Sequence, residues 1–547
     1  MYHRNKMIPM TIGQTAFTHL DRFVEQRIRA DHTPGIVLAV TDREKTLRAA
    51  TYGSSNVDRK AAITPFTLFE IGSISKSFTA LALLQLQEAG EIDLHQPVER
   101  YLPWFHVPSA YDPITLHHLL SHTGGIISGT DFTTQASYEV WALRETEATA
   151  PPGTWFHYSN VGYKVLGLVL ERVLRRGYGR IIQERVLHPL RMHNTVPVIT
   201  HEIRSKMAVG YEPLYDDRPP HPALPLAPAT WLETNTADGS IASTAGDMTS
   251  YVRMLLNRGR GPDGPIVSKQ SYDRMTQRVI RPDEDHGEFY GYGLTIDERE
   301  GRTVVGHEGG MVGYYAAVQA DLDAGVGAVV LTNGPGEPKE IARFALEVTR
   351  AALSDQNLPP LPPTPDPKRV EHPEEYTGIY RSAGRVFGLA AEDGELVMSY
   401  RDDRIALERR GRDTFYVPHV DFSRFLLRFG RQEGKIVEAL HGPDWYPHPL
   451  YTGARDFVHP PAWTAYTGHY RAHNAWLTNF RVVLRKGELL LIEPQGDEEP
   501  LQPLEDGHFR VGADPRSPER IRFDTLIDGR TARATLSGCP YYRTFTP

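Results

Sequence analysis

The last third of the chain repeats itself, and this repeat limits what that part of the chain can fold into. The segment Tyr376–Arg381, Tyr-Thr-Gly-Ile-Tyr-Arg, returns about 90 residues later as Tyr466–Arg471, Tyr-Thr-Gly-His-Tyr-Arg. Each copy is followed by a Gly-Glu-Leu hairpin signal. Short alternating strands without a helical period predict two small antiparallel β-barrels, over residues 373–458 and 459–547. Barrels of this size either hold a small ligand or are filled by side chains, and we expect them to shape a cleft or to assemble subunits.

A proline-rich segment separates the repeat from the rest of the chain. Residues 358–367 carry six prolines. Proline fixes φ and lacks a backbone N–H, so this segment cannot lie inside a helix or a central strand and is typical of a semi-rigid linker. We therefore predict a first domain over residues 1–355 and a linker over residues 356–372.

Ser73 and Lys76 stand three residues apart at the predicted start of an apolar helix. Residues i and i+3 share one face of a helix, so the lysine amine can reach the serine hydroxyl and withdraw its proton. Phe78, Leu81 and Leu84 continue the helical spacing. A Ser-x-x-Lys motif is short and arises by chance in a chain of this length, so it needs support from other motifs.

Two further motifs follow in order: Tyr158-x-Asn160 after a Pro-Pro-Gly turn, and His307-x-Gly309 between strand-like runs. With Ser73-x-x-Lys76, this set resembles the penicillin-recognising serine hydrolases, which include class C β-lactamases, DD-peptidases, esterases and D-aminopeptidases. Tyrosine in the second motif resembles the class C and DD-peptidase side of the family. Histidine instead of lysine in the third resembles its peptidase and esterase members. The resemblance spans roughly residues 15 to 353, and its flanking segments are Thr115–Ile126 and Asp238–Met248.

The secondary-structure pattern agrees with that resemblance. Helical spacing covers residues 17–28 and 341–348, and strand-like runs cover residues 35–40, 314–320 and 327–332. These elements predict an α/β (α+β) domain in which one antiparallel sheet has helices on both faces and a helical insertion between its halves. The resemblance implies the same β-lactamase-like arrangement. Its D-aminopeptidase branch also carries two lipocalin-like barrels after the catalytic domain.

The resemblance implies roles for the first two motifs. Ser73 would form the acyl-enzyme, while Lys76 and Tyr158 would share the duties of general base and of proton donor to the leaving group. Which of the two is the base stays open. Asn160 would orient Lys76 and the amide of the substrate.

The third motif would complete the site. His307 would contact Tyr158 and a carboxylate or carbonyl of the substrate. The backbone N–H groups of Ser73 and Gly310 would form the oxyanion hole. Gly309 and Gly310 suit a strand that substrate backbone approaches closely.

Substrate choice is less constrained by the sequence. The domain layout favours a peptidase or aminopeptidase with a preference for D-amino acids, acting on a small molecule or short peptide. An esterase or weak β-lactamase, a peptide-cyclising or acyl-transferring enzyme, and an acylatable penicillin-binding sensor without turnover remain alternatives, since fold does not decide among them.

Composition excludes several other classes of protein. The net charge is -8 over 547 residues, with acids and bases interspersed, so neither nucleic acid nor membrane is expected as a partner. No segment approaches the roughly 18 apolar residues of a membrane span, and no secretory signal is seen. We expect a cytoplasmic protein, or a periplasmic or secreted one if a leader was removed, and a homo-oligomer is compatible with the repeat.

No cofactor or metal is predicted. His118 and His122 are four residues apart, as in a zinc helix, but the glutamate of His-Glu-x-x-His is missing, so we expect both to be structural. The single cysteine, Cys539, leaves no internal disulfide, and we expect it to be a small buried hydrophobic residue.

Overall fold

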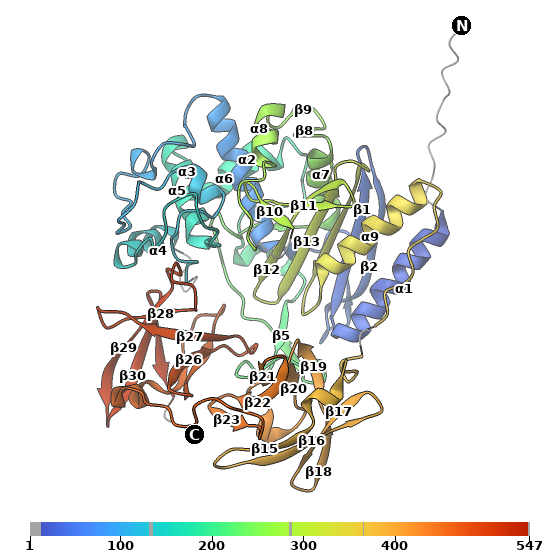
Figure 1. The fold of residues 1–547 in the computed structure, drawn as a ribbon. Coiled ribbons are helices and arrows are strands. Elements are labelled where there is room, and N and C mark those ends of the chain that lie inside the picture. The colour runs from blue at the N-terminus through green and yellow to red at the C-terminus, as the bar shows by residue number, and fades with distance from the viewer. Residues whose placement is uncertain (1–12, 131–134, 284–286, 365, 545–547) are drawn as a thin grey trace. The chain divides into compact units, whose positions relative to one another are not determined.

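The computed structural model describes the whole chain except residues 1–12, 131–134, 284–286, 365 and 545–547 (Figure 1). The chain divides into two compact units. Unit 1 comprises Met1–Glu212 and Leu226–Thr364, and unit 2 comprises Pro213–Pro225 and Pro365–Pro547. The assignment of Pro213–Pro225 to unit 2 has no counterpart in the sequence pattern.

Unit 1 is built on an antiparallel sheet of eight strands in the order β10-β11-β12-β13-β14-β1-β2-β3. Its central strand β1 is apolar without alternation because both of its faces are buried: Leu38 and Val40 lie in one hydrophobic cluster, and Val37 and Ala39 in another. The strands are β1 (Gly35–Asp42), β2 (Thr46–Asn56), β3 (Ala61–Ala62), β10 (Glu288–Tyr290), β11 (Thr295–Arg299), β12 (Arg302–Met311), β13 (Tyr314–Asp321) and β14 (Val326–Thr332).

Two terminal helices cover one face of this sheet. Helices α1 (Gln14–Asp31) and α9 (Pro338–Leu353) lie side by side (Figure 1), and the rings of Phe23 and Phe344 are 4.4 Å apart between them. Both helices contribute to the same cluster as Leu38 of β1. The predicted sheet with helices from both ends of the domain is therefore confirmed.

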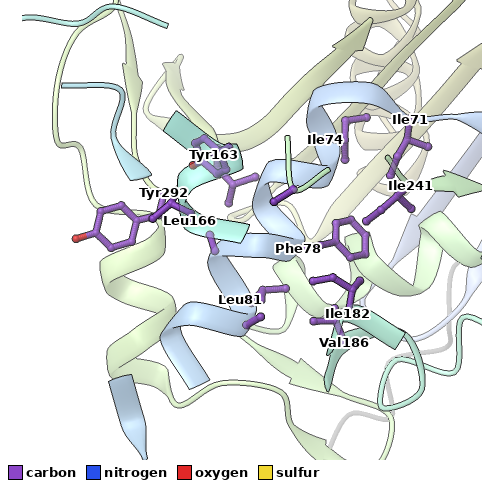
Figure 2. Close-up of a cluster of buried hydrophobic side chains, with 14 of the residues drawn as sticks. Ile71, Ile74, Phe78, Leu81, Tyr163, Leu166, Ile182, Val186, Ile241 and Tyr292 are labelled. Carbon is purple, nitrogen blue, oxygen red and sulfur yellow. The ribbon is translucent and has the colours of Figure 1, made fainter. Parts of the chain in front are cut away.

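The other face of the sheet packs against α7 (Ala245–Leu256) and the helical insertion, which surrounds the buried helix α2 (Ser75–Glu88). In Figure 2, Phe78 and Leu81 of α2 point into a cluster of side chains from neighbouring segments. Residues 75–84 of α2 are buried without a break, which explains why the stretch Ala80–Leu84 is apolar on every side. The remaining helices are α3 (Leu116–Leu120), α4 (Ala136–Ala142), α5 (Asn160–Leu174), α6 (Tyr178–Ile182) and α8 (Lys269–Met275). Three two-stranded sheets pair β4 (Phe69–Glu70) with β7 (Ala242–Ser243), β5 (Tyr211–Pro213) with β6 (Leu226–Pro228), and β8 (Arg260–Gly261) with β9 (Gly264–Pro265).

Unit 2 holds the repeat as two all-β modules. The second module is a closed eight-stranded barrel, as predicted. In the first module the strands form a four-stranded and a five-stranded sheet. Strands β18 and β19 are separated only by Leu407, whose N–H still bonds Leu396 O, so the chain bends there from one sheet into the other. The strands of the first module are β15 (Gly378–Arg381), β16 (Val386–Glu392), β17 (Glu395–Tyr400), β18 (Asp403–Ala406), β19 (Glu408–Gly411), β20 (Thr414–Tyr416), β21 (Leu427–Gln432), β22 (Lys435–His441) and β23 (Asp444–Pro447). Those of the second are β24 (Gly468–Arg471), β25 (Asn479–Arg485), β26 (Glu488–Ile492), β27 (Glu498–Pro503), β28 (Phe509–Val511), β29 (Arg520–Ile527), β30 (Arg530–Leu536) and β31 (Cys539–Arg543).

The repeated hexapeptide makes the same contacts in both modules. The hydroxyl of Tyr380 donates to the carbonyl of Tyr376 at 2.9 Å, and the hydroxyl of Tyr470 donates to the carbonyl of Tyr466 at 2.6 Å. Tyr380 and Tyr470 are fully buried in the hydrophobic interior of their own modules. The repeat therefore encodes one buried tyrosine corner used twice, and each interior is packed with apolar side chains.

The segment Pro213–Pro225 is held by both modules of unit 2. The His221 ring stacks on Tyr416 at 4.5 Å, and its Nε2 lies 2.8 Å from the Glu408 carboxylate in the first module. In the second module, the Asn479 side-chain amide donates to the carbonyl of Asp216 at 2.8 Å, and Arg471 pairs with the Asp216 carboxylate. This loop between β5 and β6 thus takes its fixed contacts from strands distant in sequence.

Candidate active site

Ser73 lies in the 3₁₀ turn Gly72–Ile74 that leads directly into α2. Gly72 has φ +50°, and a Cβ at Gly72 would lie within 2.7 Å of the backbone nitrogen of Gly310. Only glycine therefore allows this turn to pack so closely against strand β12. The close approach places the serine turn beside the third sequence motif.

The Lys76 amine is fully buried and makes three hydrogen bonds. Its Nζ lies 2.9 Å from Ser73 Oγ, 2.7 Å from Asn160 Oδ1 and 2.9 Å from the carbonyl oxygen of Asp238. All three partners are uncharged. A neutral amine can donate its two hydrogens to the Asn160 and Asp238 oxygens and present its lone pair to the Ser73 hydroxyl, which is the arrangement that proton removal needs.

Asn160 is fixed by the start of helix α5. Ser159 caps this helix by accepting a hydrogen bond from the N–H of Gly162 at 3.0 Å, and the Asn160 N–H donates to the carbonyl of Ser128 at 2.7 Å. The Ser159 N–H donates to Nδ1 of His122 at 2.9 Å. These backbone contacts hold the amide of Asn160 against Lys76.

Tyr158 packs beside Lys76. Its ring centroid is 4.9 Å from Lys76 Nζ and 4.1 Å from the His122 ring. The Tyr158 side chain is half-buried, and its hydroxyl makes no hydrogen bond with any residue that the structure describes. The hydroxyl is therefore available to a bound molecule.

His307 has a partner that the sequence did not indicate. Its Nδ1 bonds the carbonyl of Glu308, and its Nε2 lies 2.9 Å from the hydroxyl of Tyr290. Because the Glu308 carbonyl only accepts, Nδ1 carries the hydrogen, and the neutral ring accepts the Tyr290 proton at Nε2. The expected partner, Tyr158, has its ring centroid 6.4 Å from that of His307.

Burial keeps this pair uncharged. It lowers the pKa of His307 to about 4, assisted by the nearby charge of Lys339, and it raises the pKa of Tyr290 well above its ordinary value. His307 is therefore a neutral imidazole at neutral pH, whereas a lysine at this position would carry a charge. Tyr290 stands on β10 at no fixed spacing from any of the three motifs, so sequence reasoning had no signal for it.

Gly309 and Gly310 have different surroundings on strand β12. A Cβ at Gly309 would lie 1.9 Å from the carbonyl oxygen of Ile71, so this glycine is required where β12 meets the serine turn. A Cβ at Gly310 would meet nothing within 4 Å. The space beside Gly310 is open and adjoins Ser73 through the contact with Gly72.

His118 and His122, the two histidines four residues apart, both accept hydrogen bonds from backbone N–H groups. His118 Nδ1 accepts the N–H of Thr115 at the start of α3, and His122 Nδ1 accepts that of Ser159. Among the described residues, no cluster of three or more His, Cys, Asp or Glu side chains could hold a metal ion. No helix in the described part of the chain is long and apolar enough to cross a membrane.

A family model described as Beta-lactamase matches residues 20–352. The chain belongs to the beta-lactamase family. Penicillin-binding protein 4 of Amycolatopsis lactamdurans is 28% identical over 317 residues, which cover 55% of this chain and 81% of that protein. Protein flp of Staphylococcus aureus (strain N315) is 27% identical over 328 residues, covering 57% of this chain and 62% of protein flp. The chain thus spans less than two thirds of protein flp.

A solved structure supports the same family fold. The octameric penicillin-binding protein homologue from Pyrococcus abyssi aligns with a TM-score of 0.57 and 27% identity, covering 79% of this chain and 99% of that chain. The resemblance to penicillin-recognising hydrolases and the β-lactamase-like fold class are both confirmed. As a member of the beta-lactamase family, the protein has the fold of a hydrolase.

Proposed function

We propose that this protein is a serine hydrolase that cleaves amide or ester bonds through an acyl-enzyme on Ser73. The observation that carries the proposal is the 2.9 Å contact between Lys76 Nζ and Ser73 Oγ. The same amine donates hydrogen bonds to the Asn160 side-chain oxygen and the Asp238 backbone carbonyl, which hold it in place. Nucleophilic serines require such an adjacent base held by a third group.

The proposed acylation forms a bond from Ser73 Oγ to the substrate carbonyl carbon, breaks the scissile C–N or C–O bond, and passes the Ser73 proton to the leaving group by way of Lys76. Ser73 Oγ attacks the substrate carbonyl carbon while its proton passes to the lone pair of neutral Lys76. The N–H groups of Ser73 and Gly310 would stabilise the resulting oxyanion, and the contact of Gly72 with Gly310 supports this pairing. When the intermediate collapses, the leaving amine or alkoxide takes a proton from Lys76, directly or through the Tyr158 hydroxyl. Water then repeats the sequence to release the acid and restore Ser73.

For the substrate, we propose an amide or short peptide with a D-amino acid beside the scissile bond. The support is the layout of a beta-lactamase family domain followed by two all-β modules, which resembles the D-aminopeptidase branch.

An esterase is the second candidate, and a specific observation favours it. His307 is neutral, and both of its ring nitrogens are engaged by Tyr290 and Glu308. Such a ring offers no fixed positive charge for a substrate carboxylate. This favours substrates without a carboxylate at that position over β-lactam antibiotics.

A substrate panel tests the proposal. It comprises p-nitroanilides of D- and L-amino acids, p-nitrophenyl esters and nitrocefin, each measured for turnover with the wild-type chain and with Ser73→Ala. We expect D-anilide or ester turnover, lost by several orders of magnitude in Ser73→Ala.

A fluorophosphonate label identifies the nucleophile directly. It should modify Ser73, whereas Ser75 and Ser77 are fully buried, with Ser77 Oγ donating to Ile74 O at 2.7 Å. Peptide mapping that places the label on Ser75 or Ser77 would contradict the assignment.

We also propose that the protein self-associates. The support is its likeness to a homologue described as octameric, which covers 79% of this chain. Light scattering coupled to size-exclusion chromatography measures the mass directly, and a monomer at all concentrations would refute this part.

A further inference from the structure

A basic cavity of about 350 Å³ lies in unit 1, outside the site around Ser73. It is bounded by helix α7, the turn between β1 and β2, and the β8–β9 hairpin. Its lining includes four guanidinium groups and one carboxylate, from Arg43, Arg191, Arg253, Arg260 and Glu44. No residue of this lining belongs to the three motifs.

Three of these four arginines form no ion pair with any residue that the structure describes. Arg191 pairs with Asp263, but Arg43 donates to the backbone carbonyls of Leu256 and Leu322. Arg260 makes no ion pair and no side-chain hydrogen bond with any residue in the described part of the chain. The chain as a whole has a net charge of -8, so the concentration of cations here is local.

Among the four arginines, Arg253 gives the strongest support for a bound anion. Its side chain is half-buried, and its guanidinium is held by hydroxyls: it donates to Ser250 Oγ at 2.8 Å and to Thr249 and Thr46 Oγ1 at 3.1 Å each. Burial lowers its pKa, although the nearby Asp42 opposes this. Hydroxyls fix the guanidinium in place without neutralising it, and a partly desolvated cation that no described carboxylate contacts directly is costly. An anion bound in the cavity would remove that cost.

We propose that this cavity binds a small oxoanion with two or more phosphate or carboxylate groups. Arginine is suited to this task because its planar fork bonds two oxygens of such a group at once. Several guanidinium groups around one cavity match a ligand with several anionic groups better than a single monovalent ion. The proposal does not depend on the catalytic role of Ser73.

Isothermal titration calorimetry with the full chain tests this site at constant ionic strength, using pyrophosphate, citrate and chloride as probes. We expect pyrophosphate or citrate to bind with one site per chain and chloride not to compete. Tighter binding of pyrophosphate identifies a phosphate ligand, and tighter binding of citrate identifies a carboxylate ligand.

Two variants locate the binding. Arg260→Glu, at an exposed and unpaired side chain, should weaken binding at least tenfold. Arg258→Glu is the matched control, since it makes the same charge change at an exposed residue outside the lining and should alter affinity by less than threefold. Arg253→Lys keeps the charge but loses the fork, so it should also weaken binding while circular dichroism stays unchanged. The proposal is overturned if neither probe binds, or if Arg258→Glu weakens binding as much as Arg260→Glu does.

Discussion

Glu70 is a buried carboxyl three residues before Ser73, and its replacement by glutamine should stabilise the protein in a pH-dependent way. The side chain lies on β4 and is 4% exposed. It makes no hydrogen bond or ion pair with any residue in the described ranges. Burial alone raises the pKa of this carboxyl to about 8, from an ordinary value of 4.5.

The sign and size of the effect follow from proton linkage. A carboxyl whose pKa is raised by folding binds its proton more tightly in the folded state, so stability is full below pH 4.5 and falls as the pH rises toward 8. At about 1.36 kcal/mol per pH unit, the buried carboxyl lowers stability by about 3 kcal/mol at pH 7, where it must take up a proton on folding, and by about 5 kcal/mol well above pH 8, where it is ionised. Glu70→Gln removes this term, and its gain in unfolding free energy should grow accordingly.

Urea unfolding of the full-length wild type and of Glu70→Gln at pH 5, 7 and 8.5 measures this gain. Any pH-independent effect of the amide cancels when the three pH values are compared. Glu91→Gln, at an exposed position, is the matched control and should show a constant difference from the wild type. A stability difference for Glu70→Gln that stays flat from pH 5 to pH 8.5 would refute the reasoning.

Three further predictions concern the third motif and its surroundings. The pKa of His307 falls from 6.5 to about 4 on folding, so the stability of the folded state is full above pH 6.5 and is lost as the pH falls through 4. In urea melts, His307→Gln should reduce this loss of stability on acidification by about 3 kcal/mol. Tyr290→Phe leaves His307 Nε2 without its donor, and we expect kcat/KM to fall roughly three- to thirtyfold while the His307 titration, followed by NMR, shifts; an unmoved titration would contradict the pairing. Gly309→Ala should lower the melting temperature strongly because its Cβ would lie 1.9 Å from the Ile71 carbonyl oxygen, whereas Gly310→Ala should keep the fold and reduce turnover. Equal melting temperatures for the two variants would contradict this difference in space.

The parts of the fold that the sequence predicted are those with a local signature. The Tyr-Thr-Gly-x-Tyr-Arg repeat predicted two like modules, because a buried tyrosine that bonds a carbonyl four residues earlier needs only local sequence. The apolar run at residues 35–40 predicted a strand, and these residues lie in β1. The spacing of Ser73 and Lys76 likewise placed two side chains on one turn, and their atoms lie 2.9 Å apart.

Contacts between distant segments could not be predicted in this way. Asp216 lies in a polar stretch that resembles any exposed loop, yet its ion-pair partner Arg471 is 255 residues further along the chain. The split of the first module at Leu407 is also invisible in the sequence, because its strands alternate like those of the second module. Register and partner choice in such regions depend on packing that one sequence does not report.

The third motif shows why residue identity alone did not define the site. By its residue type, a histidine in place of lysine can supply a charge, a hydrogen-bond acceptor or a donor. The structure separates them through two neighbours: the Glu308 carbonyl takes the Nδ1 hydrogen, and the Tyr290 hydroxyl occupies Nε2. Protonating this ring would require burying a charge and reversing the Tyr290 hydrogen bond, since Tyr290 itself is held in its neutral form by burial. His307 therefore stands at neutral pH as a fixed neutral ring linked to Tyr290, and it brings no positive charge to the third motif.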